Sequence, residues 1–554
     1  MKGRDIFFAY LEHNRVPFLF GNPGTTELPL VDGCNDHPAV RYVMALHEDI
    51  AVAMAMGYAR ASGRIGVVNL HVAPGLGHGM GNLYNAFRAG TPLIVTAGQQ
   101  HTRLVVHDPI LTADLAAMAR PFTKWSYDVR FVEELPTVMQ RAFKEATTAP
   151  TGPVFISLPM DVLLEPVTFD PPVAASEIAS TIADPDAVAH AARVLADATH
   201  PMIVAGDGVG LACAWPEVVA IAERLGAPVY TEQYSTIWNF PSDHPHFAGP
   251  MPNQAVAMRQ RFEGVDVALL AGFTAQAPVA RFDEKGSLIP PSVQIVAVHD
   301  RPWEIGKNQP TAMGLPGAIK RNLASLRDAL GAAPDAAASA RGAAVRGASA
   351  KRASQWRAQA DAARAKGTLT ATVAAAELAA VFPRDGIFVD ESISNREAFV
   401  NQVAFADPIA YFAGKGLSLG YSVGAAAGLK LGAPERPVVT VVGDGSLLYY
   451  PQALWSLAAL ELPCVTVVLN NGSYRVLKLI VGRMGGPWND AKQALPGLDF
   501  ETPRVDFAAM AKSMGLDGER VSKTAELRPA LERAFAAKRP YVIDVLLDQP
   551  GEDA

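Results

Sequence analysis

Short apolar runs alternate with helix-like segments along most of this 554-residue chain, and this alternation constrains the fold more than any other feature. In the first third, the apolar runs are 17–22, 65–71, 92–98 and 152–159. Residues 48–61, between the first two runs, are mostly small and apolar and favour a helix. A repeated strand–helix pattern is typical of a parallel sheet that carries helices on both faces. The sequence therefore predicts an α/β fold.

The pattern restarts twice, which predicts three consecutive doubly wound parallel-sheet domains. A chain of this length also exceeds what one hydrophobic core usually organises. We expect the domains at 1–180, 185–332 and 367–554. The segment 333–366 is rich in Ala and Arg, has little to bury, and favours a solvated helix or connector.

Composition and charge exclude several classes of partner. The net charge of −7 gives no attraction for nucleic acid or for an anionic membrane surface. No apolar run reaches the length of a membrane span, and residues 1–16 favour an amphipathic helix rather than a signal peptide. Cys34, Cys213 and Cys464 are far apart and show no metal-ligand spacing, which suits a reducing cytoplasm. We therefore expect a cytoplasmic protein.

Two short polar motifs follow apolar runs near the C-terminal end. Gly443-Asp444-Gly445-Ser446 comes directly after the run 436–442, and Asn470-Asn471-Gly472 closes the next run, 463–470. Residues 451–460 between them favour a helix, so both motifs lie where parallel strands end and where open α/β sheets bind ligands.

A carboxylate and a carboxamide at that edge offer oxygen ligands to Mg²⁺, which keeps part of its coordination for phosphate oxygens. The glycines, and a helix N-terminus after Gly445, favour a bound phosphate. The residues alone suit any magnesium-diphosphate ligand, or simply two tight turns.

At this spacing, Asp444 and Asn471 resemble the binding motif for thiamine diphosphate (ThDP). Three α/β units in sequence resemble the ThDP-dependent decarboxylases and the acetolactate-synthase-like enzymes. The resemblance implies a pyrimidine-binding first domain, a structural middle domain and a diphosphate-binding third domain. It implies Mg²⁺ ligands from Asp444, Asn471 and the carbonyl of Ser473. The diphosphate contacts that it implies come from Gly443, Gly445, Ser446, Asn471, Ser473 and Tyr474.

A ThDP enzyme also needs a carboxyl group at ring nitrogen N1′ of the cofactor, because that contact drives the tautomer that activates the thiazolium. Glu48 opens the apolar helix 48–61 and is our candidate. The alternative is a glutamate placed for the helix dipole, although Asp49 suits that role better. In the family, this glutamate and the diphosphate site belong to different subunits. The resemblance therefore implies at least a homodimer, and often a homotetramer.

The segment 412–421 resembles the part of the family that bends the cofactor between two domains. By that resemblance, Leu419 is the apolar wedge under the cofactor, and the backbone carbonyl of Leu417 receives the 4′-amino group. The alternative for Leu419 is a plain core residue.

Within the family, the chain most resembles benzoylformate decarboxylase, through segments 20–29, 69–71, 92–100 and 124–127 and over essentially its whole length. This implies ThDP- and Mg²⁺-dependent, non-oxidative decarboxylation of a 2-oxo acid to an aldehyde, with carboligation as a further activity. Thr25 stands where that enzyme has a serine that binds the substrate carboxylate. His71 matches its first catalytic histidine, a proton relay, and the alternative is a satisfied loop histidine.

The second catalytic histidine of that enzyme has no counterpart in 272–279, where Gln276 is the nearest polar residue. His101 and His107 follow the run 92–98, and they either stand in for it or are surface loop residues.

In the substrate pocket, Val476 and Ile480 match positions where that enzyme has a smaller and an aromatic residue. Branched aliphatic side chains there suit a smaller or aliphatic 2-oxo acid. His78 replaces an amide of that enzyme.

Two other functions stay open: an acetolactate-synthase-like carboligase, and a ThDP-binding protein with little catalysis, which the altered histidine set motivates. Residues 206–210 follow a predicted strand and are similar to a dinucleotide fingerprint. Their spacing is Gly-x-Gly-x-Gly, however, and no clear acidic partner follows. We expect a structural turn there rather than an FAD or ADP site.

Overall fold

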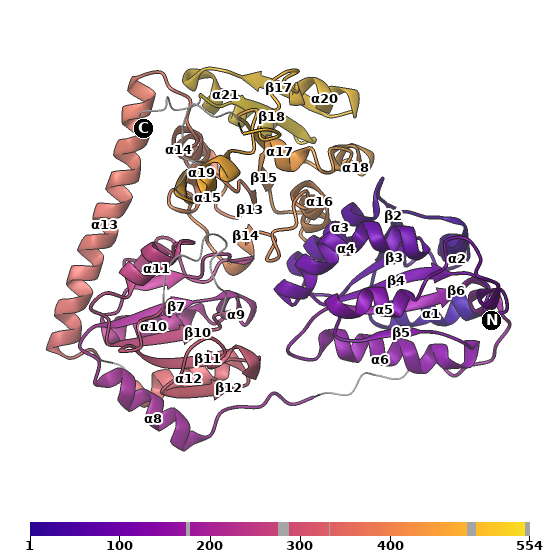
Figure 1. Ribbon diagram of the computed structural model, residues 1–554, viewed down its shortest axis with the longest axis horizontal. Helices are drawn as coiled ribbons and strands as arrows, with labels where there is room; N and C mark the ends of the chain where they lie inside the picture. Colours follow the sequence, from indigo (N-terminus) through magenta and orange to yellow (C-terminus); the bar gives the residue numbers. More distant parts are fainter. Residues whose placement is uncertain (173–177, 275–286, 332, 485–494, 549–554) are drawn as a thin grey trace.

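The computed structural model describes residues 1–172, 178–274, 287–331, 333–484 and 495–548. These residues form three six-stranded sheets, one in each third of the chain, and the strand pairs within them are parallel. Helices cover the faces of each sheet (Figure 1). The predicted α/β class with three doubly wound domains is confirmed. We call these the N-terminal, middle and C-terminal domains.

The N-terminal domain has the strand order β2-β1-β3-β4-β6-β5. Three of these strands are buried along their whole length, which explains why their sequences are apolar runs without polar alternation. The strands are β1 (Phe18–Gly21), β2 (Arg41–Met44), β3 (Gly66–Leu70), β4 (Leu93–Gln99), β5 (Ser126–Asp128) and β6 (Val154–Pro159). The helices are α1 (Gly3–His13), α2 (Leu28–Asp36), α3 (Glu48–Ser62), α4 (Val72–Ala89), α5 (Leu115–Ala119), α6 (Leu135–Thr147) and α7 (Met160–Leu164).

The middle domain has the strand order β12-β11-β10-β7-β8-β9. Its strands are β7 (Pro201–Ala205), β8 (Val229–Thr231), β9 (Phe247–Pro250), β10 (Val267–Ala271), β11 (Gln294–His299) and β12 (Met313–Pro316). Its helices are α8 (Pro185–Ala196), α9 (Asp207–Leu211), α10 (Trp215–Leu225), α11 (Ala255–Arg261) and α12 (Ile319–Leu330).

The C-terminal domain has the strand order β14-β13-β15-β16-β18-β17. Its strands are β13 (Ile387–Glu391), β14 (Tyr411–Phe412), β15 (Val438–Gly443), β16 (Cys464–Asn470), β17 (Asp517–Val521) and β18 (Tyr541–Leu546). Its helices are α14 (Ala371–Val381), α15 (Arg396–Val400), α16 (Ser422–Gly432), α17 (Asp444–Leu447), α18 (Ala453–Ala459), α19 (Arg475–Met484), α20 (Phe507–Ser513) and α21 (Thr524–Ala536).

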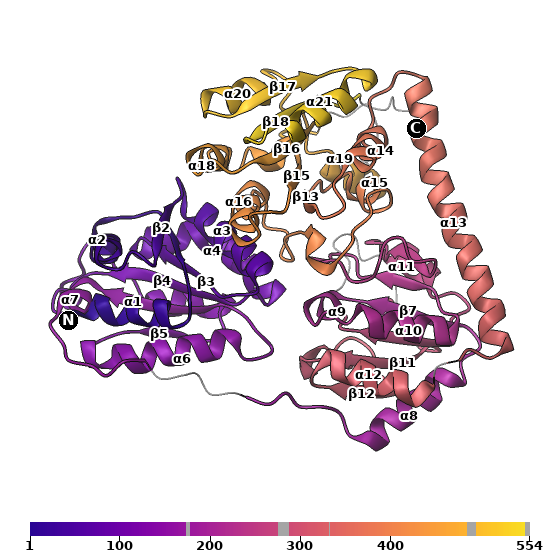
Figure 2. The same ribbon diagram turned by 180° about the vertical axis from the view of Figure 1, so that it is seen from behind.

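The Ala/Arg-rich segment forms one long helix, α13 (Ala336–Ala365), as the sequence predicts. Its 30 residues give it a length of about 45 Å at the usual rise per residue. Asp335 caps its first turn by accepting a hydrogen bond from the N–H of Ala338 at 2.7 Å. The helix runs along one side of the molecule, from the middle to the C-terminal domain (Figures 1 and 2). Within the described ranges, the structure contains no helix with the length and apolarity that a membrane span requires.

The order of strands reverses between β1 and β3 in the N-terminal sheet, and between β13 and β15 in the C-terminal sheet. Such switch points open a crevice at the carboxyl ends of the strands. Gly21 of β1 pairs with Asn69 of β3, so the loops that follow these two strands leave the sheet side by side. Gly443 of β15 pairs with Leu469 of β16, which brings the two polar motifs together.

Helices α3 and α16 cross at backbone contact and join the N-terminal to the C-terminal domain (Figures 1 and 2). A Cβ atom at Gly57 would lie 2.1 Å from the carbonyl oxygen of Ala425. One at Gly428 would lie 1.8 Å from the carbonyl oxygen of Met54. Both distances are far below van der Waals contact, so only glycine fits at either position.

Candidate active site

The carboxyl group of Asp444 follows β15 and binds the backbone that follows β16. Its Oδ2 atom accepts hydrogen bonds from the N–H groups of Asn471 at 2.8 Å and Gly472 at 2.6 Å, and its Oδ1 atom from Gly445 at 2.8 Å. Asp444 is only 2% exposed. The structure therefore brings the two polar motifs of the sequence into direct contact.

The predicted Mg²⁺ ligands lie in one cluster. The Oδ1 atom of Asn471 accepts hydrogen bonds from the N–H of Ser473 at 3.0 Å and from its hydroxyl at 3.1 Å. Both residues are buried. The ring of Tyr474 packs on Phe500 with centroids 5.1 Å apart. The Asp444 carboxyl group and the Asn471 amide oxygen are hard oxygen ligands, and the Ser473 carbonyl is the third that the resemblance implies.

This ligand set suits a divalent cation. Burial raises the pKa of Asp444, against the opposing effects of its backbone donors and of the charge on Arg504. A cation would offset that burial and favour the ionised carboxylate. The backbone beside it also has room for a phosphate, because a Cβ atom at Gly443 would meet no atom closer than Oγ of Ser446 at 3.8 Å. The residues present therefore fit a metal-bound diphosphate.

The expected helix dipole after Gly445 is smaller than the sequence suggested. Helix α17 has only four residues, so its end partial charge is that of a single turn. The predicted diphosphate contact would therefore depend on hydrogen bonds rather than on the dipole. Ser446, 7% exposed and in this turn, offers its hydroxyl.

The loop that carries Leu417 and Leu419 leaves β14 and reaches α16. Leu417 has a left-handed backbone, with φ of 59°, and Leu419 is half-buried. At the end of the loop, Gly420 and Ser422 donate their N–H groups to the carboxyl of Glu391, the last residue of β13. Burial raises the pKa of Glu391 to about 7. The loop is thus fixed to the switch point of its own sheet.

Lys415, near the start of the same loop, anchors it to the middle domain. Its Nζ atom lies 3.0 Å from Oδ2 of Asp207 and also donates to Oε1 of Glu232. All three side chains are buried. Burial and the charge of Asp207 raise the pKa of Glu232 to about 8, because two carboxyl groups share one ammonium.

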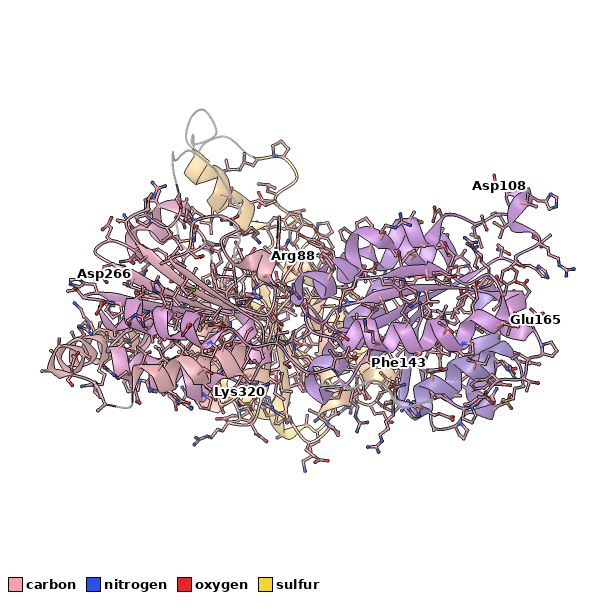
Figure 3. All side chains as sticks on the ribbon, turned by 90° about the horizontal axis from the view of Figure 1, so that it is seen from below. Arg88, Asp108, Phe143, Glu165, Asp266 and Lys320 are labelled. Atoms are coloured by element: carbon pink, nitrogen blue, oxygen red, sulfur yellow. The ribbon has the colours of Figure 1, made fainter. Side chains whose placement is uncertain are left out.

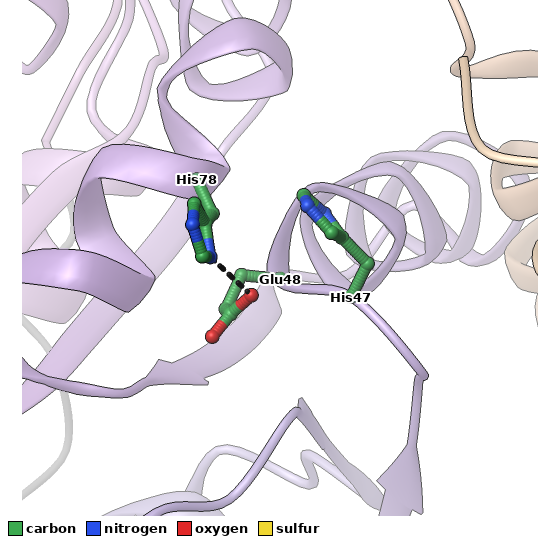
Figure 4. Close-up of side chains that lie close together, drawn as sticks. All are labelled: His47, Glu48 and His78. Carbon is green, nitrogen blue, oxygen red and sulfur yellow. Dashed lines mark hydrogen bonds and ion pairs between the residues drawn. The ribbon is translucent and has the colours of Figure 1, made fainter.

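Glu48 begins α3, as the sequence predicts, and is 5% exposed. Its Oε2 atom lies 3.1 Å from Nδ1 of His78 on α4. His47, the N-cap residue of α3, stacks on His78 with ring centroids 5.1 Å apart (Figure 4). A Cβ atom at Gly75, one turn before His78 on α4, would lie 3.0 Å from Oε1 of Glu48. The carboxyl group is thus packed against α4, beside the exposed His78.

Asp49 is not simply a charge placed for the helix dipole. It is fully buried, and its two carboxyl oxygens accept hydrogen bonds from the backbone and the side chain of Asn82, at 2.7 Å and 2.9 Å. Burial raises its pKa to about 7. Asp49 therefore ties α3 to α4.

His71, the last residue of the predicted run 65–71, directly follows β3, and its imidazole contacts the loop after β1. Its Nδ1 atom lies 2.7 Å from Oε2 of Glu27. A Cβ atom at Gly24 would lie 2.0 Å from Nδ1 of His71, so glycine is needed where this loop meets the ring. Thr25 follows Gly24 at the start of the turn Thr25–Glu27 and is exposed. The switch point thus brings two of the predicted catalytic residues, Thr25 and His71, onto neighbouring loops.

Glu27 is the residue of this group that the sequence did not single out. It is fully buried, and its Oε1 atom accepts hydrogen bonds from the hydroxyl of Thr26 at 2.7 Å and the N–H of Gly98 at 2.9 Å. Its sequence neighbours, Thr25 and Thr26 before it and Leu28 after it, give no spacing signal for a functional acid.

The remaining predicted residues are dispersed. Val476 and Ile480 lie one turn apart on α19, and both are half-buried. His101 pairs with Asp161 at 3.3 Å and is 46% exposed, and His107 lies in an exposed turn of the same loop. This placement favours surface loop residues over a second catalytic histidine. Gln276 lies outside the described residues.

In the glycine motif at 206–210, the space beside the glycines is occupied by the protein's own backbone. A Cβ atom at Gly206 would lie 2.3 Å from the carbonyl oxygen of Gly272, and one at Gly210 would lie 2.7 Å from that of Trp238. Asp207 between them is buried against Lys415. Close backbone packing thus accounts for these glycines, as expected for a structural turn.

Models of the thiamine pyrophosphate enzyme family match all three parts of the chain. The N-terminal TPP binding domain matches residues 1–118, the central domain 188–326 and the C-terminal TPP binding domain 396–545. The chain is 33% identical to benzoylformate decarboxylase of Pseudomonas aeruginosa, over 97% of both chains. It is 27% identical to the acetolactate synthase large subunit of Corynebacterium glutamicum, over 100% of this chain and 87% of that protein.

A solved structure of similar fold is the thiamine diphosphate-dependent 4-hydroxybenzoylformate decarboxylase of Rhodococcus jostii RHA1. It has a TM-score of 0.86 and 28% identity, over 99% of this chain and 100% of that one. Together with the geometry at Asp444 and at the β1–β3 switch point, these matches show that the chain is a ThDP-dependent enzyme, a carboxy-lyase by its relatives, of the decarboxylase and acetolactate synthase family.

Proposed function

We propose that this enzyme decarboxylates a 2-oxo acid without oxidation, in the manner of benzoylformate decarboxylase, and releases CO₂ and an aldehyde. The observation that carries this proposal is the His71–Glu27 pair, which places an oriented imidazole beside the exposed Thr25 at the β1–β3 switch point. An acid–base group at a carboxyl-end crevice is what proton transfer to and from a bound keto acid requires.

Each residue has a defined task in this proposal. Asp444, Asn471 and the carbonyl of Ser473 hold Mg²⁺, and Gly443, Gly445, Ser446 and Tyr474 surround the diphosphate. Leu419 would support the bound cofactor, and the Leu417 carbonyl would accept a hydrogen bond from its 4′-amino group. Bound ThDP supplies a nucleophilic carbon and a sink for the electrons that CO₂ leaves behind.

Glu48 would bind the cofactor at ring nitrogen N1′ and hold a proton there. Thr25 donates its hydroxyl to the carboxylate of the substrate. His71 moves a proton at the keto oxygen through Nε2, because Nδ1 is engaged by Glu27. Val476, Ile480 and His78 shape the pocket, and the two branched aliphatic side chains suit a smaller or aliphatic acyl group.

The site in this proposal is shared between two copies of the chain, and a homodimer is the smallest active unit. A loop of the N-terminal domain supports this arrangement, because Leu104, Val106 and Ile110 are 50%, 82% and 83% exposed. Figure 3 shows Asp108 at the projecting tip of that loop. Apolar side chains gathered on one exposed loop are typical of a surface that a partner covers. The free thiols of Cys34, Cys213 and Cys464 suit a cytoplasmic location.

The experiment is CO₂ release from aromatic, linear and branched 2-oxo acids with ThDP and Mg²⁺ added. We expect turnover with at least one acid, and the loss of turnover in Glu48→Gln with the fold retained. Glu217→Gln is the matched control, because Glu217 is 7% exposed and lies in α10 of the middle domain. A fully active Glu48→Gln enzyme would contradict the assignment, as would ThDP binding without turnover across the panel.

Acetolactate-synthase-like carboligation is the second candidate, and the likeness to acetolactate synthase over the whole chain favours it. Analysis of the products from pyruvate alone separates the two, since decarboxylation yields acetaldehyde and carboligation yields acetolactate. A purified protein without flavin absorbance would argue against the FAD-containing synthases, in agreement with the filled glycine turn at 206–210.

A further inference from the structure

The conformation of Leu417 needs an external restraint. A leucine with φ of 59° has a left-handed backbone, which L-residues with a Cβ atom adopt only at a cost in free energy. Leu417 lies in a loop without regular secondary structure, so no helix or strand hydrogen bonds fix it. The orientation of its carbonyl must therefore come from groups that pack against the loop.

Asn85, on α4 of the N-terminal domain, supplies that restraint. Its Oδ1 atom accepts hydrogen bonds from the N–H groups of Gly416 at 2.9 Å and Ser418 at 3.3 Å. Its Nδ2 atom donates to the carbonyl of Ser418 at 2.9 Å. One side-chain amide thus binds the residues on both sides of Leu417. Asn85 is fully buried, so water cannot replace these hydrogen bonds.

Asn85 is itself held by a chain of hydrogen bonds that ends beside Glu48. Its Nδ2 atom also donates to Oδ1 of Asn82 at 2.8 Å. Asn82 in turn donates its backbone N–H and its side chain to Asp49, the neighbour of Glu48. Both donors and both acceptor positions of the Asn85 amide are used, and this fixes which atom is oxygen and which is nitrogen. Only a side-chain amide matches two N–H groups and two oxygens, and glutamine would place that amide one carbon farther from the helix.

We propose that Asn85 is a positioning residue that holds Leu417 in its left-handed conformation, so that the Leu417 carbonyl meets the 4′-amino group of bound ThDP. This inference rests on the proposed function for the role of that carbonyl. Asn85 contacts neither substrate nor cofactor in this scheme, and it acts only through the loop. Its loss therefore affects the activation of the cofactor and not the affinity for the 2-oxo acid.

The first test uses Asn85→Asp, which keeps the shape of the side chain but turns the donor Nδ2 into an oxygen that faces two oxygens. We expect faster amide hydrogen exchange across 414–420 in the protein without cofactor. With saturating ThDP and Mg²⁺, the exchange of the C2 proton of bound ThDP and kcat should both fall about tenfold or more, the scale of the left-handed penalty, while KM for the 2-oxo acid stays unchanged.

The second test combines Asn85→Ala with Leu417→Gly. Glycine adopts positive φ without a penalty, so it should recover part of the lost C2 exchange and kcat if Asn85 acts through the conformation of Leu417. Asn322→Ala is the matched control. Asn322 is a buried asparagine of α12 that bonds the N–H of Ala183 and the carbonyl of Pro316, far from the loop in the middle domain. It should lower the melting temperature but not kcat.

Unchanged hydrogen exchange at 414–420 in Asn85→Asp would overturn the proposal. So would a loss of activity that Leu417→Gly does not relieve and that Asn322→Ala reproduces. If the wild-type protein binds no ThDP, the proposed function itself fails. Faster hydrogen exchange at 414–420 in Asn85→Asp would then show that Asn85 only stabilises the loop, and the positioning role would be refuted. If ThDP binds but no 2-oxo acid is turned over, C2 exchange still decides the role of Asn85.

Discussion

Nδ1 of His71 lies 2.7 Å from Oε2 of Glu27, and the carboxyl group of Glu27 is fully buried. A carboxyl acceptor at Nδ1 selects the tautomer with the proton on Nδ1 and leaves Nε2 as the reactive nitrogen. The two residues are 44 positions apart in sequence, and the β1–β3 switch point brings them together.

Glu27→Gln should therefore lower kcat without weakening the binding of ThDP. The amide oxygen can still accept hydrogen bonds, but the new NH₂ group faces donors, either His71 and the N–H of Gly24 or the N–H of Gly98. Disturbing a partner that orients a functional histidine typically costs about 10- to 100-fold. Steady-state kinetics and ThDP titration by fluorescence check this expectation. An enzyme with wild-type kcat would show that the pair has no part in proton transfer.

Removing the metal site should weaken the binding of the cofactor and not only slow the chemistry. Asp444→Ala deletes a carboxyl that joins the two motifs through backbone N–H groups at 2.8 Å and 2.6 Å. Loss of a residue that only orients a metal ligand costs up to about 100-fold in affinity. Because Asp444 is itself a proposed ligand, we expect the affinity for ThDP in the presence of Mg²⁺ to fall by more than that. Isothermal titration measures it, and chelation with EDTA should have the same effect on the wild type. Equal ThDP affinity with and without Mg²⁺ would speak against the site.

Asp49 makes the stability depend on pH in a predictable direction. Its pKa is raised by burial from 3.8 to about 7, so the folded protein binds a proton between these pH values that the unfolded chain releases. The contribution is fully present below about pH 4 and is lost as the pH rises through 7, with a slope of at most about 1.4 kcal/mol per pH unit. In Asp49→Asn, this fall should be missing. Denaturant titrations from pH 4 to 8 measure the difference, and parallel curves for the two proteins would contradict it.

Val476 should control which acyl group is accepted. Val476→Ala removes two methyl groups from a half-buried position on α19, one turn before Ile480. A change of one or two methylene-sized groups in an apolar pocket is worth about 10- to 200-fold in specificity. We expect kcat/KM for benzoylformate to rise relative to that for 2-oxobutyrate. Leu477→Ala, at an exposed position on the same helix, is the control and should leave the ratio unchanged.

The strands could be predicted because parallel sheets bury both faces. The runs that became β3, β4 and β6 are buried along their whole length. The ends of the runs that became β15 and β16 indicated where Asp444 and Asn471 would meet. The length of α17 could not be predicted, since a four-residue turn has no periodicity. Glu27 and Asn85 were missed for a different reason. Their partners are 44 and more than 300 residues away, and only the folded topology places them within hydrogen-bonding distance.

The backbone contact between α3 and α16 limits how this enzyme can be recombined. Any side chain larger than a hydrogen atom at Gly57 or Gly428 would clash with the backbone of the other helix. The sequences of the two helices are therefore matched to each other. A chimera that takes its first domain from one relative and its third from another would set foreign side chains against these glycine notches. Exchange of α3 and α16 as one unit, with both domains from a single parent, avoids that clash. The middle domain, which is attached through α13 and Lys415, is therefore the segment that we expect to tolerate exchange between relatives best.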